Sequence, residues 1–311
     1  MSETASPVRR GRPIRVAAAF VVLLAVIGYV IVQYETGGGA PRCTVRGAEA
    51  DGPSYELTAE QAANAATISA VGTTRGMPER AVTIALATAL QESALRNIEH
   101  GDRDSLGLFQ QRPSQGWGTP AQILDPVYAS RKFYEHLDEV PGYSRLPLTV
   151  AAQRVQRSGF PQAYAKHEPD ATLLAAALTG RASATLTCAV RGGGDAGDPA
   201  KVRTELVRVF GPDVLPGGVQ GGGAKSGSAG AAAAGEVTLP VPATSGSASG
   251  GPASRRGWEL AHWAVARADG LRIAEVSYGG RVWHADESDE GWQKGGAPER
   301  GTDTVRIRIA Q

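Results

Sequence analysis

The chain of 311 residues has little cysteine, few aromatic side chains and almost no net charge. Aromatic residues make up 6% of the chain and the formal net charge is +1, so no basic field predicts a nucleic-acid partner. The H-E-x-x-H, G-x-S-x-G and C-x-H patterns are also missing, which disfavours a peptidase. His262 and His284 have no third ligand at metal spacing, so we expect neither a metal nor a cofactor.

The two cysteines, Cys43 and Cys188, lie 145 positions apart. A disulfide between them would tie together the ends of the region 43–190 and would require an oxidising compartment. Two free buried thiols are the alternative. Because no other cysteine competes for pairing, the sequence favours the disulfide.

One long apolar run carries no charge from Val16 to Val32. Extended to residue 34, it is just long enough to span a bilayer. Arginines precede it in residues 1–15, which predicts a cytoplasmic tail, a transmembrane signal anchor at 16–34 and an extracellular bulk at the cell membrane. A cleaved signal peptide is the alternative, although no A-x-A site follows the run.

Helical patterns dominate the next part of the chain, and we expect helices at 57–75, 78–94, 120–137, 149–158 and 171–178. Thr58 and Gln61 form a plausible capping box for the first of these. The second is apolar nearly all round, which predicts a central, buried helix.

Glu92 lies at the end of that apolar helix, before a polar loop at 97–120. Burial and the negative end of the helix dipole both favour a protonated carboxyl, which cleavage of a glycosidic bond needs near neutral pH. The loop is rich in amides and holds the aromatic ring of Trp117, groups that suit a sugar. An ordinary polar loop around a buried tryptophan is the alternative.

Three short motifs occur in order: Glu92-Ser93, the G-D-R that begins at Gly101, and the G-L-F-Q that ends at Gln110. Together they resemble the catalytic region of goose-type lysozymes and soluble lytic transglycosylases. The resemblance covers roughly residues 57–180 and implies a lysozyme-like domain at 43–190 that acts on peptidoglycan glycan strands. Arg112 stands where goose-type enzymes have a second Asp, and the A-Y-N-A-G run of lytic transglycosylases is missing.

The resemblance implies that Glu92 is the general acid for the bond between N-acetylmuramic acid and N-acetylglucosamine. If Asp102, or alternatively Asp104, positions a water, the bond is hydrolysed; without a second carboxylate, the product is a 1,6-anhydro sugar. Tyr164 is the candidate for the tyrosine that lies near the acid in lytic transglycosylases. The expected substrate-binding residues are Ser93, Gln110, Gln111, Gln115 and Trp117. A non-catalytic peptidoglycan-binding or scaffold protein with the same fold is the alternative function.

Residues 191–254 are rich in Gly, Ala and Ser, which predicts a flexible linker with one short amphipathic helix at 199–210. Residues 255–311 then hold four of the five tryptophans, and packing explains these better than ligand binding does. This last part predicts a helix, a Gly279-Gly280 hairpin turn and strands at 273–278, 281–285 and 304–309.

The part 255–311 resembles small C-terminal domains of secreted actinobacterial wall proteins, which are distant relatives of zinc D-Ala-D-Ala carboxypeptidases. The histidines of those relatives are missing from its last strand, so the resemblance implies a non-catalytic module that binds an envelope protein partner. The expected fold class is mainly α: a lysozyme-like helical domain behind one transmembrane helix, with a small α+β C-terminal domain.

Overall fold

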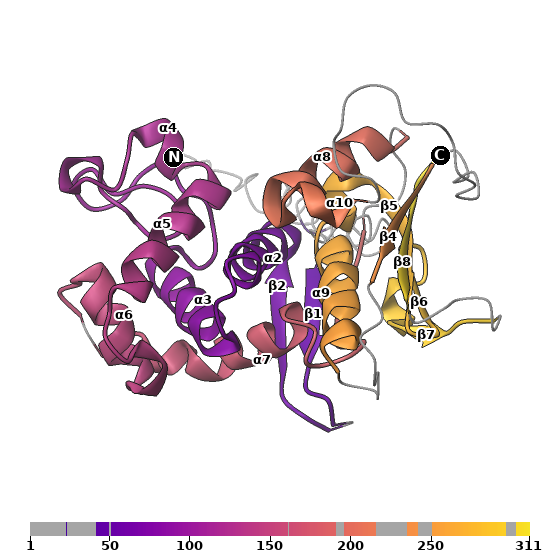
Figure 1. The fold of residues 1–311 in the computed structure, drawn as a ribbon, viewed down its shortest axis with the longest axis horizontal. Coiled ribbons are helices and arrows are strands. Elements are labelled where there is room, and N and C mark those ends of the chain that lie inside the picture. Colours follow the sequence, from indigo (N-terminus) through magenta and orange to yellow (C-terminus); the bar gives the residue numbers. More distant parts are fainter. Residues whose placement is uncertain are drawn as a thin grey trace, which may run out of the picture. The chain divides into compact units, whose positions relative to one another are not determined.

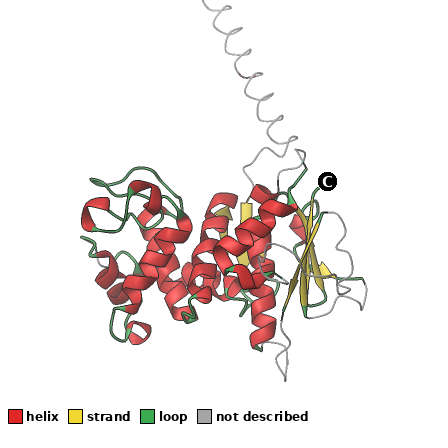
Figure 2. Ribbon diagram, turned by 45° about the horizontal axis from the view of Figure 1, so that its top comes forward, coloured by secondary structure: helices red, strands yellow, loops and turns green. Residues whose placement is uncertain are grey.

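A computed structural model describes the chain at Leu23 and at residues 42–49, 51–160, 162–190, 196–215, 235–241, 251–296 and 303–311. Pro41–Gln311 forms one compact unit, and the following description concerns this unit alone. Most helices gather on one side of it and the larger sheet lies on the other (Figures 1 and 2). Between them lie α2 (Ala59–Thr74), α7 (Glu168–Leu178) and α9 (Pro252–Ala266).

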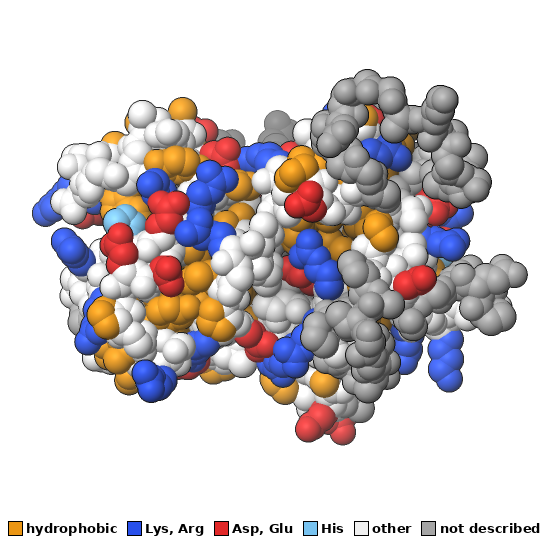
Figure 3. Space-filling model, in the orientation of Figure 1, with side chains coloured by type: hydrophobic (Ala, Val, Ile, Leu, Met, Phe, Trp, Pro, Cys, Tyr) orange, Lys and Arg blue, Asp and Glu red, His pale blue; other side chains and the backbone are white. Residues whose placement is uncertain are grey.

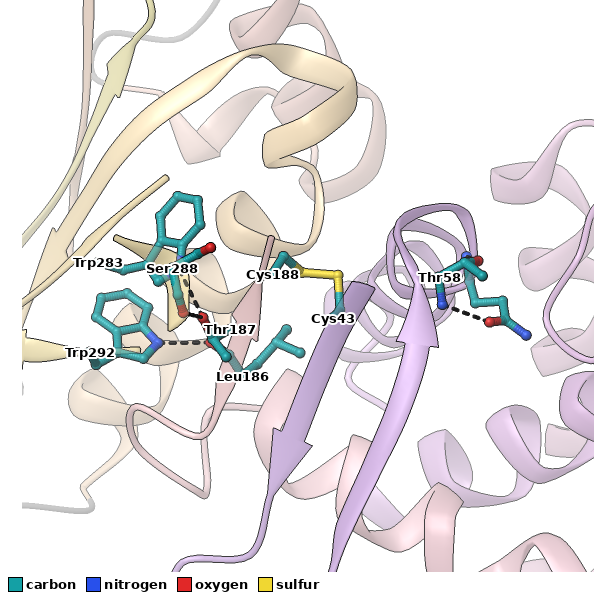
Figure 4. Close-up of a disulfide and its surroundings, with 9 residues drawn as sticks. Cys43, Thr58, Leu186, Thr187, Cys188, Trp283, Ser288 and Trp292 are labelled. Carbon is teal, nitrogen blue, oxygen red and sulfur yellow. Dashed lines mark hydrogen bonds between the residues drawn. A yellow bond between two sulfur atoms is a disulfide. The ribbon is translucent and has the colours of Figure 1, made fainter. Parts of the chain in front are cut away.

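A small antiparallel sheet joins the beginning of this unit to the segment around Cys188. Its strands lie in the order β2 (Ser54–Thr58), β1 (Arg42–Arg46) and β3 (Leu186–Cys188). Alternation explains β1, because Cys43 and Val45 are buried whereas the arginines at its two ends are exposed. Cys43 faces Cys188 in the register of the sheet, and the two form the predicted disulfide (Figure 4).

Helix α3 (Glu79–Ser93) is the centre of the helical half. Every residue from Ala81 to Leu90 is buried, which confirms the prediction of a central helix. A helix that is apolar on all sides needs neighbours on all sides. These are α2, α7, α5 (Pro126–Asp138) and α6 (Leu148–Gln156).

Helix α2 begins at the predicted capping box. Thr58 Oγ1 accepts the backbone N–H of Gln61 at 3.2 Å, and Gln61 Oε1 accepts the N–H of Thr58 at 2.8 Å. The two bonds satisfy amides that the first turn of a helix leaves unpaired. The remaining short elements are α4 (Pro120–Ile123), η1 (Pro113–Gln115), η2 (Tyr143–Arg145), η3 (Ala165–His167), η4 (Pro212–Val214) and η5 (Ser288–Glu290).

The larger sheet has five antiparallel strands in the order β4-β8-β5-β6-β7. Helix α9 packs against its β5 and β8 strands. The elements of this part are α8 (Pro199–Phe210), β4 (Glu236–Pro240), α10 (Ala268–Leu271), β5 (Ile273–Tyr278), β6 (Arg281–His284), β7 (Gln293–Lys294) and β8 (Thr304–Ile309). Helix α8 has the predicted bounds, and the β5–β6 hairpin turns at the predicted glycine pair, where φ is 59° and 73°.

The other face of α9 contacts α2, α7 and β3. His262 is fully buried in this contact, where its Nδ1 lies 2.7 Å from the Ala177 carbonyl oxygen and its Nε2 accepts the Thr185 N–H at 3.3 Å. Burial lowers the pKa of His262 to about 4, so the ring is neutral and Nδ1 carries the proton.

Glu259 is also buried in this contact, with 5% of its surface exposed. Its Oε1 accepts the hydroxyl of Thr73, which belongs to α2, and its Oε2 lies 2.9 Å from Arg256 Nη1. The Arg256 guanidinium in turn lies 4.7 Å from the ring centre of Phe210 on α8. One carboxylate therefore joins α2, α9 and, through Arg256, α8.

The four tryptophans of the C-terminal part are all buried: Trp258, Trp263, Trp283 and Trp292. Two of them bond to β3, as Figure 4 shows: Trp283 Nε1 donates to Thr187 Oγ1 at 3.0 Å, and Trp292 Nε1 donates to the Leu186 carbonyl at 2.8 Å. Packing thus accounts for the tryptophans, and the C-terminal part holds the strand that carries Cys188.

The expected fold class, mainly α, is wrong, because two sheets of three and five strands are integral to the unit. Strands β1, β2 and β3 were not predicted, because they are only three to five residues long. Strand β4 lies inside the predicted linker 191–254, where buried Val237 and Leu239 alternate with more exposed neighbours and pair with β8.

Among the described residues, no helix is long and apolar enough to cross a membrane. The longest described helix, α2, has 16 residues, whereas a bilayer core requires about 20. This finding contradicts the predicted single-pass placement at the cell membrane. The segment 16–34, for which the span was predicted, lies outside the described residues except for Leu23.

Charges of both signs are mixed on one face of the molecule. On the face drawn in Figure 3, acidic, basic and hydrophobic side chains of the described residues alternate over the helical half. This agrees with a formal net charge of +1.

Candidate functional site

Glu92 lies one residue before the end of α3 and is half-buried. Its Oε1 accepts the hydroxyl of Tyr164 at 2.6 Å. Tyr164 is fully buried, and burial, followed by the bond to Glu92, raises the pKa of its hydroxyl above the ordinary value. The tyrosine therefore remains protonated at neutral pH and is the donor in this bond. Two of the three residues predicted as catalytic thus touch each other.

Helix α3 ends abruptly because two residues after it are left-handed. Ala94 and Leu95 have φ angles of 52° and 59°, a region that costs a non-glycine residue about 1 kcal/mol or more. Side chains of α2 stabilise this end: Gln61 Nε2 donates to the Ala94 carbonyl and Asn64 Nδ2 to the Leu95 carbonyl, each at 2.8 Å. The chain therefore leaves the helix axis immediately after Ser93.

Ser93 holds the following loop to the helix. Its hydroxyl is buried, with 5% of the residue exposed, and lies 2.8 Å from the Leu108 carbonyl and 3.1 Å from the Ala89 carbonyl. Both carbonyls can only accept, so the single hydroxyl proton is shared between them. Predicted to bind substrate, Ser93 instead has its hydroxyl turned into the protein.

The G-L-F-Q turn is closed by backbone bonds between Leu106 and Gln111 at 2.9 and 3.0 Å. Gly107 has a φ of 74°, and a Cβ there would lie 2.7 Å from the Ile123 carbonyl oxygen, so only glycine fits. Gln110 is half-buried and left-handed, with φ 47°, and its Nε2 donates to the Gly107 carbonyl at 3.2 Å. A Cβ on Gly101 of the G-D-R motif would overlap the Gln110 amide, so the two motifs lie against each other.

Two helices hold this turn from below. The ring of Phe109 is fully buried and stacks on Phe133 of α5 with ring centres 4.7 Å apart. Gln156, the last residue of α6, donates from Nε2 to the Phe109 carbonyl at 2.7 Å. The turn is therefore fixed relative to both α5 and α6.

The other predicted sugar contacts differ in exposure. Gln111 is buried and its Nε2 donates to the Ala129 carbonyl at 3.0 Å, so this amide supports the fold. Gln115 is exposed on η1. Trp117 is half-buried, with its ring centre 4.3 Å from that of His136. Of the predicted amides, Gln110 and Gln115 have surface open to a ligand.

The two candidate second carboxylates have different environments. The Asp102 side chain is 94% exposed, and its nearest cation is Arg103 at 4.0 Å. Asp104 accepts from Arg112 Nε on one oxygen and from the Ser114 N–H on the other, both at 2.8 Å. The Arg112 guanidinium, followed by Ser114, holds the pKa of Asp104 well below its usual range. Asp104 is therefore a fixed anion of the loop.

A second contact beside Glu92 is absent from the predictions. Gln91 Oε1 lies 3.2 Å from His167 Nε2, so neighbouring residues of α3 both contact the segment Tyr164–His167. Burial, followed by Lys166, lowers the pKa of His167, so its ring is neutral at pH 7 and can donate to Gln91. Tyr164 and His167 are about one helical turn apart in the sequence. This spacing is the signal from which the contact of His167 could have been predicted.

Among the residues that the structure describes, no three His, Cys, Asp or Glu side chains gather as metal ligands. Both nitrogens of His262 bond to the backbone, and His284 Nδ1 lies 3.6 Å from Glu275. The side chain that contacts the Glu92 carboxyl is the Tyr164 hydroxyl. No family model matches this chain, and no curated protein matches it either.

Proposed function

We propose that the protein is a muramidase of the lytic-transglycosylase type, which cleaves the bond between N-acetylmuramic acid and N-acetylglucosamine in peptidoglycan. The observation that carries this proposal is the contact of 2.6 Å between the Tyr164 hydroxyl and Glu92 Oε1. It is the pairing expected from the resemblance to lytic transglycosylases, between residues 72 positions apart in the chain.

We assign the role of general acid to Glu92. Tyr164 occupies Oε1, while Oε2 has no hydrogen-bond partner within the described part of the chain. Oε2 is therefore the oxygen that is open to a substrate atom, and in this proposal it carries the proton that is donated. The acceptor of that proton is the glycosidic oxygen, which becomes the hydroxyl of the departing N-acetylglucosamine.

The environment of the loop carboxylates favours the anhydro product. Asp104 is bound by Arg112 and Ser114, and Asp102 is almost fully exposed, so neither is held as a base for water. After the first proton transfer, the Glu92 carboxylate can accept the proton of the C6 hydroxyl as that oxygen attacks C1 of N-acetylmuramic acid. The C1–O bond to the leaving sugar breaks, the 1,6-anhydro ring forms, and Glu92 is protonated again without consumption of water.

The test uses the full chain, purified with its disulfide formed and incubated with purified peptidoglycan. Mass spectrometry of the released fragments is compared with the Glu92→Gln variant. We expect 1,6-anhydro fragments from the wild type alone. Hydrated reducing ends would instead indicate hydrolysis, with Asp102 as the next residue to change.

One observation favours a second candidate, a glycan-binding protein without turnover. Arg112 occupies the position of the second Asp of goose-type enzymes and neutralises Asp104. This candidate predicts that the protein sediments with peptidoglycan, that Glu92→Gln sediments equally, and that neither releases fragments.

A further inference from the structure

Phe160 is unusually exposed for its side chain. Among the described residues, three large hydrophobic side chains are exposed: Leu23 at 51%, Val150 at 36% and Phe160 at 78%. Phe160 is the aromatic one and the most exposed. An aromatic ring has a large apolar surface, so an exposed ring gains free energy when a ligand covers it.

The backbone of Phe160 is tied on both sides. Its N–H donates to Ser158 Oγ at 3.1 Å, and its carbonyl accepts the Ala163 N–H at 3.0 Å. The Ser158 carbonyl is in turn bound by Gln153 Nε2 of α6 at 2.7 Å. The exposed ring therefore belongs to a residue whose own backbone N–H and carbonyl are both hydrogen-bonded.

This turn lies between two contacts of the candidate site. On its N-terminal side, Gln156 donates to the Phe109 carbonyl of the G-L-F-Q turn. On its C-terminal side, Tyr164 follows directly after the bonded Ala163 and places its hydroxyl on Glu92. The segment that carries Phe160 is thus fixed at one end to the loop and at the other to the acid.

We propose that Phe160 is a stacking platform for a pyranose ring of the glycan, next to the bond that Glu92 cleaves. The inference rests on the proposed function and extends it to a binding position. The apolar face of a pyranose carries C–H groups that pack on a flat ring, and an exposed ring on an ordered turn is already positioned for this contact. Trp117, the aromatic residue expected to contact a sugar, is half-buried, with its ring centre 4.3 Å from that of His136.

The test measures binding without turnover. A soluble β-1,4-linked hexamer of N-acetylglucosamine is titrated calorimetrically into the full-length Glu92→Gln variant, used as the parent. Phe160→Ala and Phe160→Trp are added to this parent, with Val150→Ala as the matched control on another exposed apolar side chain. We expect Phe160→Ala to raise Kd about tenfold, and Phe160→Trp and Val150→Ala to remain within about twofold of the parent.

Thermal unfolding of each variant accompanies the titration, and an unchanged Tm for Phe160→Ala excludes a folding defect as the cause. If Phe160→Ala binds the hexamer as tightly as the parent, the platform is refuted and the proposed function stands. If the parent itself does not bind the hexamer and the wild type releases no fragments from peptidoglycan, both the platform and the proposed function fail.

Discussion

Two buried or half-buried glutamates, Glu92 at the end of α3 and Glu259 on α9, show how differently this chain uses the same side chain. Glu259 is 5% exposed and both of its oxygens are bonded, one by Thr73 and the other by Arg256. Glu92 is half-buried, with one oxygen bonded by Tyr164 and the other without a partner among the described residues. Glu259 has both oxygens bonded within the fold, whereas Glu92 has one oxygen open to a ligand.

The surroundings of the two glutamates support this distinction. Near Glu259, His262 has both ring nitrogens bonded to backbone atoms, so the α9 contact is a polar network that fixes geometry. Near Glu92, the left-handed Ala94 and Leu95 and the left-handed Gln110 indicate a backbone held in costly conformations. Such conformations persist only where surrounding contacts stabilise them. Here Gln61, Asn64 and Gln156 supply these contacts by donating hydrogen bonds to loop carbonyls.

The largest expected effect is a loss of activity when Glu92, but not Glu259, is replaced. Glu92→Gln should lower the rate of fragment release from peptidoglycan by about 10²- to 10⁴-fold, because the amide cannot donate a proton in the same way. Its free energy of unfolding should stay within about 0.5 kcal/mol of the wild type. Glu259→Gln is the matched control and should keep its activity. Equal losses of activity in both variants would contradict the distinction between a catalytic Glu92 and a structural Glu259.

The next effect concerns stability and pH at the α9 contact. Burial lowers the pKa of His262 from 6.5 to about 4, so its contribution to stability is complete above pH 6.5 and is lost as the pH falls toward 4. The loss should reach about 3 kcal/mol over that range. Urea unfolding of the wild type and of His262→Asn measures it, since the variant lacks the titrating ring. If the free energies of unfolding of the two proteins changed in parallel with pH, His262 would not be the group whose titration lowers the stability.

A smaller effect is expected at the partner of Glu92. Tyr164→Phe keeps the buried ring and removes the hydroxyl, which should lower activity about 10- to 100-fold, the value of a hydrogen bond to a charged group. Tyr134→Phe is the matched control, because that buried hydroxyl donates to the Ile68 carbonyl at 3.0 Å, away from Glu92. We expect Tyr134→Phe to lose stability and keep activity. Full activity of Tyr164→Phe would show that the contact has no chemical role.

The smallest effect concerns the exposed carboxylate. Asp102→Asn should change the rate of fragment release by less than about threefold, because a side chain that is 94% exposed holds no water against a substrate. A loss comparable to that of Glu92→Gln would favour hydrolysis with Asp102 as base.

Local patterns in the sequence predicted several parts of this fold. The capping box at Thr58 and the bounds of α8 follow from short-range residue preferences, and the central position of α3 follows from its apolar circumference. The disulfide was also predicted, because two cysteines allow one pairing. The resemblance placed Tyr164 beside Glu92, and the structure brings the two into contact.

Other parts depend on contacts that no local pattern encodes. Strand β3 has three residues and pairs with β1 across a separation of 145 positions, so neither its length nor its partner is apparent from alternation. The bond between Arg112 and Asp104 depends on the path of an irregular loop, and it removes a carboxylate that the motif alone leaves available. The exposure of Phe160 is likewise a property of the folded turn, because most aromatic side chains are buried.

The most direct measurement is a crystal structure of the Glu92→Gln variant with an oligosaccharide of alternating N-acetylglucosamine and N-acetylmuramic acid. We expect the glycosidic oxygen within about 2.6–3.2 Å of the side chain at position 92, on the atom that does not contact Tyr164. An oligosaccharide bound elsewhere, or one whose glycosidic oxygens all lie beyond reach of a single bridging water from that side chain, would contradict the role of Glu92 as the acid.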